Sequence, residues 1–365
     1  MSNARKLADN LPSVGQHGNR NLIINGAMQV AQRGAGPFTN ASGGYQTVDR
    51  FKLDGTMGGS FTLEQSSDAP SGSGFDKSFK ALAPTGFSSP TSSASTKVVT
   101  SIEGQNLQHL LYGTSDAVYL TVSFWVKATV TGTYILEIEQ ADASRHLSTA
   151  YTISSSNTWE KKTITVVGDT SGTINNDNGS GLSLKWFIAA GSIFTSGTLA
   201  TTWASTTTAN RAVGQVNGVA SNNDAFYITG VQLEVGSQST PFEHEPVGVT
   251  LKKCQRYYWN TNQFNNRYVT AIKHGGNWYC SFSAPTTMRA DPTPIGTGGS
   301  TNSYKIWDGD GSSTQSGGPS VSAGASGTIL VVKTASIGSN GEAGLMTFGD
   351  GTNADRAFVA LDAEL

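Results

Sequence analysis

The chain has 365 residues, a formal net charge of −2 and only 14% charged residues, against about 25% in an average soluble protein. Its 43 glycines, with abundant Ser, Thr and Asn, disfavour helices and suit short strands joined by turns. The sequence has no basic stripe and no apolar run of about 18 residues, so we predict neither nucleic-acid binding nor membrane insertion.

Residues 1–20 form a polar leader without the apolar segment of a signal peptide. This leader is either a frayed tail or a segment that docks onto a larger assembly and becomes ordered there. Without a signal peptide, Cys254 and Cys280 are expected to be reduced thiols rather than a disulfide. A zinc site would need two more ligands, and His274 is the one histidine near these cysteines in the sequence.

Short strands are predicted along the first two thirds of the chain. The segment NLIINGAMQV, residues 21–30, reads as the first strand, and a Gly-containing loop leads from it to TVDRF, residues 47–51. Residues 117–130 alternate apolar and polar side chains, and residues 131–140 follow as the second strand of a predicted hairpin. Further strands are expected at residues 159–169, 182–194 and 225–236, the last with a bulge at Thr229-Gly230.

A domain boundary is predicted near residues 239–248, where two prolines and a glycine interrupt the pattern. Residues 249–259 suggest a short helix or turn at the start of the second unit. Strands are expected within RYVTAIKH, NWYCSFSAP, SYKIWDG, GTILVVKTAS and ADRAFVALDAEL, with residues 308–327 as a long loop or flap. No amphipathic helices separate the strands, so an antiparallel sandwich is favoured over a parallel α/β sheet.

Several motifs together resemble one family. NLIINGAMQVAQRG with TVDRF opens the first domain, AFYITGVQLEVGSQSTPFE with LKKCQRYYW closes it, and APTTMRADPTPI follows. This combination resembles the carbohydrate-binding-module-like jelly roll of tail-fibre and other virion proteins of tailed bacteriophages. The implied fold is all-β: a short N-terminal attachment peptide (1–20), an antiparallel jelly-roll sandwich (21–246) and a smaller C-terminal β-sandwich (247–365).

The resemblance also implies local structure. In such a jelly roll residues 21–30 would lie beside residues 227–235, and Asp49 and Arg50 would fix the corner between the opening loop and the sandwich. The family often has a structural calcium ion between the early segment and the last strand. Here those positions carry Met28 and Thr229-Gly230, which supply too few oxygen ligands, so no metal and no cofactor is predicted. The DGDG at residues 308–311 reads as a plain turn.

Catalysis is not expected. Glu137 and Glu139 share one strand face about 7 Å apart, as a glycosidase pair could, but a solvated strand face is the preferred interpretation. The five histidines are scattered, and no G-x-S-x-G, H-E-x-x-H or P-loop motif is present. We therefore predict that the chain is not an enzyme.

Aromatic side chains are the candidate ligand-binding residues, because sugar rings stack on aromatic faces while polar neighbours bind their hydroxyls. The candidates are Tyr119, Trp125, Tyr134, Trp159, Trp186 and Trp203. Of these, the predicted site is Tyr119, Trp125, Trp159 and Trp203. The face that Tyr119 and Trp125 share could equally be an interface with another subunit or domain. Residues 257–268, rich in aromatics and amides, are either a subunit contact or an ordinary strand-turn-strand.

The predicted function is that of a structural virion protein of a tailed phage, with tail-fibre attachment to host-surface glycans as the first choice. It would be made in the host cytoplasm, attach to other virion proteins through residues 1–20 and form a homotrimer, as phage fibres of this kind typically do. The alternatives are a capsid or tail decoration protein that stabilises the particle, and a polysaccharide-degrading tail spike. A spike would normally need a long repetitive β-helix, and no such repeat is present.

Overall fold

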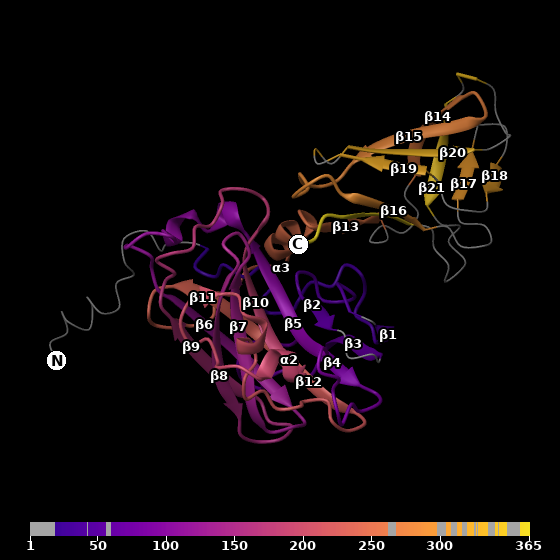
Figure 1. The fold of residues 1–365 in the computed structure, drawn as a ribbon. Helices are drawn as coiled ribbons and strands as arrows, with labels where there is room; N and C mark the ends of the chain where they lie inside the picture. Colours follow the sequence, from indigo (N-terminus) through magenta and orange to yellow (C-terminus); the bar gives the residue numbers. More distant parts are fainter. Residues whose placement is uncertain are drawn as a thin grey trace. The chain divides into compact units, whose positions relative to one another are not determined.

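A computed structural model describes residues 19–41, 43–55, 60–261, 268–297, 304–307, 312–315, 320–324, 326, 328–334, 340–341, 343–348 and 358–365. The chain divides into two compact units, residues 1–246 and 247–365, and each is described by itself (Figure 1). Residues 1–18 of the predicted attachment peptide lie outside the described part of the chain.

The first unit is an antiparallel jelly-roll sandwich of two six-stranded sheets. Sheet A has the order β1-β3-β4-β12-β6-β9, with bounds Phe38–Ala41, Phe61–Ser66, Ser78–Ala83, Asp224–Val235, Leu120–Ala128 and Glu160–Val166. Sheet B has the order β11-β8-β7-β10-β5-β2, with bounds Ala204–Ser205, Arg145–Ile153, Gly132–Gln140, Ser180–Ala190, Ser95–Glu103 and Lys52–Gly55. Short helices η1 (Gly104–Asn106), η2 (Gln108–Leu110), α2 (Ser192–Thr195) and η3 (Thr208–Asn210) lie in the connections.

The core lies between the two sheets. Strand β6 buries every second residue completely, as its alternating sequence predicts. Phe124 of β6 packs edge-to-face on Tyr151 and Trp186 of sheet B, with ring centroids 5.3 and 5.7 Å away. The inward rows of apolar residues therefore face each other across the sandwich, as expected for two sheets that are each apolar on one side.

The prediction that residues 117–140 form a hairpin is wrong. β6 pairs with β12 and β9 in sheet A, whereas β7 pairs with β8 and β10 in sheet B. Gly132, with φ of +137°, starts β7 where the chain passes from one sheet to the other. Each of these two strands has one row of apolar side chains. Both rows are buried equally well whether the strands pair in one sheet or lie in opposite sheets and face each other across the core. Strands β1 to β5, β8 and β11 were not predicted.

Residues 21–30 form turns rather than a strand, but they lie against β12 as expected. Leu22 donates its N–H to the Leu233 carbonyl (2.9 Å), and Val231 donates to the carbonyl of Gly26 (2.9 Å). A Cβ at residue 26 would overlap the Val231 carbonyl, so glycine is required for this close approach. The segment thus supports the last strand of sheet A without extending the sheet.

Asp49 and Arg50 hold the predicted corner. The buried carboxylate of Asp49 accepts hydrogen bonds from the backbone N–H and side-chain amide of Gln32, at 3.0 and 2.5 Å. Arg50 is also buried and donates from Nη2 to the Ser101 carbonyl at 2.7 Å, although its φ is +70°. The two side chains tie the opening loop to sheet B.

The second unit begins with α3 (Val247–Gln255) and contains two antiparallel sheets. A three-stranded sheet has the order β13-β22-β16, with bounds Tyr258–Asn260, Phe358–Asp362 and Thr293–Thr297. A seven-stranded sheet has the order β18-β17-β21-β14-β15-β20-β19, with bounds Ser312–Gln315, Tyr304–Trp307, Ala343–Phe348, Tyr268–His274, Asn277–Ser283, Thr328–Thr334 and Ser320–Ala323. Trp259, Trp278 and Met346 are among the residues of its buried core.

One expectation for this unit needs correction. The predicted loop 308–327 contains strands β18 and β19, because its Ser and Thr residues pair as edge strands. Residues 257–268 were expected to be either a subunit contact or an ordinary strand-turn-strand; Tyr257, Tyr258 and Trp259 are buried within the chain at 1, 5 and 1% exposure, and residues 262–267 lie outside the described part. Trp259 belongs to the buried core of the second unit, so these three aromatic side chains favour the second interpretation.

Both cysteines are buried, and no disulfide joins them. Over the described residues, no helix is long and apolar enough to cross a membrane. The same part of the chain contains no group of three or more His, Cys, Asp or Glu side chains placed to hold a metal ion.

Candidate functional site

A row of polar and aromatic side chains crosses the outer face of sheet A. Strand register places Glu64, Lys80, Tyr227 and Lys127 directly beside one another on β3, β4, β12 and β6. Trp159 lies immediately before β9, next to Lys127, and we call these five residues with Asp68 the aromatic ladder. Their outward direction follows from period-two alternation, because Phe79, Phe226 and Val126 on the same strands point into the core.

The Lys127 ammonium joins the two aromatic rings of the ladder. Its Nζ lies 4.3 Å from the centre of the Tyr227 ring and 5.4 Å from that of Trp159. The two rings meet edge-to-face at 6.2 Å. Lys127 also forms an ion pair with Asp68. A cation above aromatic faces is attracted by their quadrupoles, so the three side chains stabilise one arrangement.

Asp68 holds the Trp159 indole in place. The indole N–H donates to Asp68 Oδ1 at 3.0 Å. Burial alone would raise the pKa of Asp68, but hydrogen bonds from Lys127 and Trp159 outweigh it and hold this pKa below its ordinary value. At the other end, burial would lower the pKa of Lys80, and its 3.0 Å hydrogen bond to Glu64 raises it instead. Both groups therefore stay charged at neutral pH.

A second aromatic group lies one row further along the strands. Trp125 and Phe75 flank Gly230, where the register of β12 shifts between Thr229 and Gln232. This shift is the predicted bulge. Phe75 packs edge-to-face on Phe242, with centroids 4.8 Å apart. Trp125 is partly exposed, and the register places it opposite the exposed Lys161 on β9.

This surface has the chemistry of a sugar-binding platform. Trp159, Tyr227 and Trp125 are all partly exposed, so their rings can contact the C–H faces of a sugar ring. Asp68 and Glu64 can accept hydrogen bonds from hydroxyls, and the partly exposed Lys80 can donate them, whereas Lys127 is buried beneath the rings. The side-chain exposures of 44% for Asp68 and 28% for Glu64 leave both carboxylates open to solvent.

The structure separates the four predicted site residues into two pairs. Trp125 and Trp159 lie on the outer face of sheet A, as described. Tyr119 is 49% exposed and precedes β6, and the register that pairs Leu120 with Val166 brings it beside Val167 at one end of the sheet. The Trp203 indole donates to the Val167 carbonyl at 2.8 Å and packs edge-to-face on Tyr112. Tyr119 and Trp203 thus form a separate aromatic edge.

Two other aromatic residues considered from the sequence are excluded. Trp186 and Tyr134 are completely buried in the core of the sandwich. Sequence reasoning missed Tyr227, although the alternation of AFYIT puts it on the outer face, opposite to Phe226 and Ile228. Lys127 has the same parity as Trp125 and could have been found in that way. Asp68 lies in a connection, and its place beside Trp159 depends on tertiary structure.

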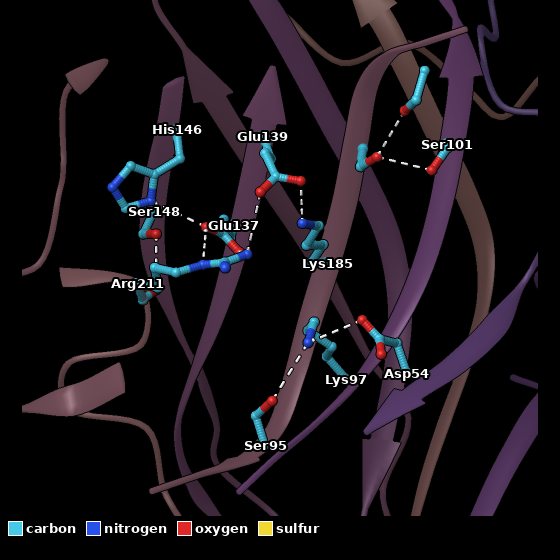
Figure 2. A network of polar contacts seen from close by, with 12 residues as sticks. Asp54, Ser95, Lys97, Ser101, Glu137, Glu139, His146, Ser148, Lys185 and Arg211 are labelled. Carbon is cyan, nitrogen blue, oxygen red and sulfur yellow. Dashed lines mark hydrogen bonds and ion pairs between the residues drawn. The ribbon is translucent and has the colours of Figure 1, made fainter. Parts of the chain in front are cut away.

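Glu137 and Glu139 lie on the outer face of sheet B, beneath residues 191–216, which we call the strap. Figure 2 shows the Arg211 guanidinium of the strap between the two carboxylates. Arg211 Nε and Nη2 donate to the two oxygens of Glu137, each at 2.7 Å, and Nη2 lies 3.4 Å from Glu139 Oε1. His146 Nδ1 is 3.0 Å from Glu137 Oε1, and Lys185 forms an ion pair with Glu139.

The expected solvated face is therefore wrong for Glu137, which has no exposed surface. Burial alone would raise the pKa of Glu137, but hydrogen bonds from His146 and Arg211 outweigh it and lower this pKa to about 2. A general acid needs a pKa near the working pH, so Glu137 cannot serve as the acid of a glycosidase pair at neutral pH. The carboxylate holds the strap instead.

Apolar contacts hold the rest of the strap. Ile135 and Phe187, on outward positions of sheet B, are fully buried against Ala212 of the strap, with Phe194 and Leu199 packed around them. The Ser148 hydroxyl donates to the Arg211 carbonyl at 2.8 Å, and Gln215 accepts from the Ile135 N–H at 2.8 Å. Much of this face is thus covered by the chain itself, which leaves sheet A with the accessible aromatic surface.

Comparison with known proteins gives structural likenesses alone. No protein-family profile and no curated protein matches the sequence. The enzymatically active domain of bacteriophage CBA120 tailspike protein 4 is 16% identical with a TM-score of 0.31, over 59% of this chain and 21% of that one. The chain thus corresponds to about a fifth of the tailspike domain's length.

Two carbohydrate-binding modules are similar at the same level. TmCBM61, solved with β-1,4-galactotriose, is 10% identical with a TM-score of 0.29, over 59% of this chain and 99% of the module. The C-terminal family 22 module of Clostridium thermocellum Xyn10B is 9% identical with a TM-score of 0.30, over 62% and 98%. All these TM-scores are below 0.5, so the jelly-roll assignment rests on the sheet topology given above.

Proposed function

We propose that this chain is a non-catalytic structural protein of a tailed-phage virion, a tail fibre that attaches to host-surface glycans. The observation that carries glycan binding is the aromatic ladder, in which two partly exposed rings lie beside the solvent-accessible carboxylates of Asp68 and Glu64 and the partly exposed ammonium group of Lys80. The phage origin is supported by the sequence motifs that open and close the first domain. Residues 1–20 would attach the protein to other virion proteins.

Binding would be multivalent. A shallow platform on a sheet face buries little of a sugar, so a single site is expected to be weak. Three copies held together as a homotrimer would raise the overall affinity by about 10²- to 10⁴-fold without any new contact. The decoration protein and the polysaccharide-degrading spike remain the competing functions, and the ion-paired state of Glu137 argues against the spike mechanism at that carboxylate pair.

The test is an array of bacterial lipopolysaccharide O-chains and capsular polysaccharides, followed by titration calorimetry with the best oligosaccharide. Trp159→Ala and Tyr227→Ala should each lower its affinity by about 2- to 13-fold, since an aromatic contact contributes about 0.5–1.5 kcal/mol. Trp203→Ala is the matched control, because Trp203 lies on the separate aromatic edge and should leave binding unchanged.

Four results would contradict the proposal. The wild-type protein could bind no glycan on the array, or both ladder variants could bind as tightly as the wild type. Release of reducing ends from a bound polysaccharide would favour the tail spike. Regular occupancy of the capsid lattice by a protein that binds no glycan would favour the decoration protein.

A further inference from the structure

The lysines on the strands of sheet A differ in whether a carboxylate neutralises them. Four lysines lie on these strands, and the three that form an ion pair are Lys80, Lys127 and Lys162. The fourth, Lys161 on β9, is exposed and forms neither an ion pair nor a hydrogen bond with a residue in the described part of the chain. Its ammonium group is therefore available to a ligand.

Lys161 lies on the outer face of the sheet, beside Trp125. β9 turns Ile164 and Val166 into the core, so Lys161 has the opposite parity and points outward. Strand register pairs it directly with Trp125 of β6, and the Cβ atoms of such a pair lie about 4.5–5.5 Å apart. Trp125 is the one side chain of β6 that is not buried. An accessible indole and an accessible ammonium group are thus neighbours.

This pair continues the surface of the aromatic ladder. Trp159 precedes Lys161 by two positions, so the two side chains lie on the same side of the chain, about 7 Å apart along it. On the other side of Trp125, the Phe75 ring lies over Gly230 of β12, close enough that a Cβ on this glycine would be 2.7 Å from Phe75. A sugar ring stacked on Trp125 would therefore have Phe75 at one edge and Lys161 at the other.

The carboxylates around this position are already neutralised or covered. Asp68 and Glu64 of the ladder each have a lysine partner. Glu234 also occupies an outward position of the sheet, but it is 3% exposed and accepts a hydrogen bond from the backbone N–H of residue 240. Beside Phe75, the adjacent charges of Asp76-Lys77 sum to zero. The charge of Lys161 is thus the one left uncompensated on the outward positions of these strands.

We propose that the glycan bound by the ladder contains an acidic sugar, which stacks on Trp125 and places its carboxylate on the Lys161 ammonium group. A sugar carboxylate projects from the edge of its ring, so a ring that lies flat on the indole directs this group sideways, toward a neighbouring residue. Neutral glycans keep the aromatic contact but lack the ion pair, which makes Lys161 a specificity-determining residue. The inference rests on the proposed glycan-binding function and adds the charge of the ligand to it.

The test uses the polysaccharide array with every acidic polymer in two forms, native and carboxyl-reduced, the latter with each carboxylate converted to a primary alcohol. The wild-type protein should bind a native uronic-acid polymer, and reduction should weaken binding about 5-fold, the effect of one solvent-exposed ion pair. Lys161→Gln should lose the same factor toward the native polymer and nothing toward the reduced one. Raising the salt concentration from about 0.05 to 0.5 M should weaken native binding more in the wild type than in Lys161→Gln.

Two further variants separate charge from position. Lys161→Arg keeps the charge and should bind the native polymer as the wild type does. Lys162→Gln is the matched control, because Lys162 has the opposite parity and donates to Glu160 at 2.6 Å, so binding should not change.

The outcomes distinguish this inference from the function on which it rests. A wild-type protein that binds only neutral or only phosphate-bearing polymers overturns the acidic-sugar assignment and leaves glycan binding intact. Equal affinity of the wild type and Lys161→Gln for a native uronic-acid polymer overturns the role of Lys161. A protein that binds nothing on the array contradicts the glycan-binding function itself, and the inference falls with it.

Discussion

Arg211→Met is expected to detach the strap from sheet B. The substitution keeps much of the side-chain volume but removes the two 2.7 Å hydrogen bonds to Glu137, whose carboxylate would remain buried without its main counter-charge. Removing one partner of a buried ion pair costs about 3–5 kcal/mol. For a domain of this size each kcal/mol lowers the melting temperature by about 2–4 °C, so a decrease of about 6–20 °C is expected.

The pH dependence of stability gives a second measure of the same interaction. The folded-state pKa of Glu137 is about 2, below its ordinary value of 4.5. A carboxylate with a lowered pKa contributes stability that is fully present above the unfolded-state pKa and is lost as the pH falls toward the folded-state pKa. The gap corresponds to about 3 kcal/mol, which should disappear between about pH 5 and pH 2. Glu137→Gln should remove this part of the acid dependence.

The assay combines thermal denaturation with amide hydrogen exchange, because the strap could open before the sandwich unfolds. The Val216 N–H of the strap donates to the Thr133 carbonyl of β7, and the Ser148 N–H of β8 donates to the Ala200 carbonyl of the strap, so both amides report strap closure. The double variant Glu137→Gln/Arg211→Met should recover part of the loss, because no unpaired charge remains. A decrease of less than about 2 °C in Arg211→Met, with both amides still protected, would refute the reasoning.

Two other predictions follow from individual contacts. Gly230 has φ of +59°, and a Cβ there would lie 2.7 Å from Phe75 Cζ and 3.1 Å from Trp125 Cδ1. Gly230→Ala should therefore cost about 1–2 kcal/mol more in unfolding free energy than Gly214→Ala, which has a similar φ of +87° but open space, and equal costs would contradict the packing argument. Cys280 is 2% exposed, and burial raises its pKa to about 12. At pH 8 a thiol reagent should label neither cysteine in the native protein and both in 6 M guanidinium, whereas rapid native labelling would show that the second unit opens.

The alternating pattern of the sequence predicted much of the first unit. Residues 117–130 and 225–236 were identified as strands with the correct inward rows, and the bulge at Thr229-Gly230 was located, because side-chain parity is a local property of an extended chain. The same pattern did not identify pairing partners. Strands β6 and β7 follow each other in sequence but belong to opposite sheets, since either arrangement buries both apolar rows.

The candidate site, too, was predicted only in part from the sequence. Trp125 and Trp159 were found because aromatic residues on outward positions are visible in the sequence. Their partners were not: Asp68 reaches Trp159 from 91 positions away, and Tyr227 and Lys127 meet through β12 and β6. The composition and the two-residue alternation of apolar and polar side chains determined that the protein is antiparallel β. They also determined which side chains point into the core. Only the tertiary structure decided that Glu137 is buried beneath Arg211 and which aromatic residues share a surface, because both depend on contacts between segments far apart in the chain.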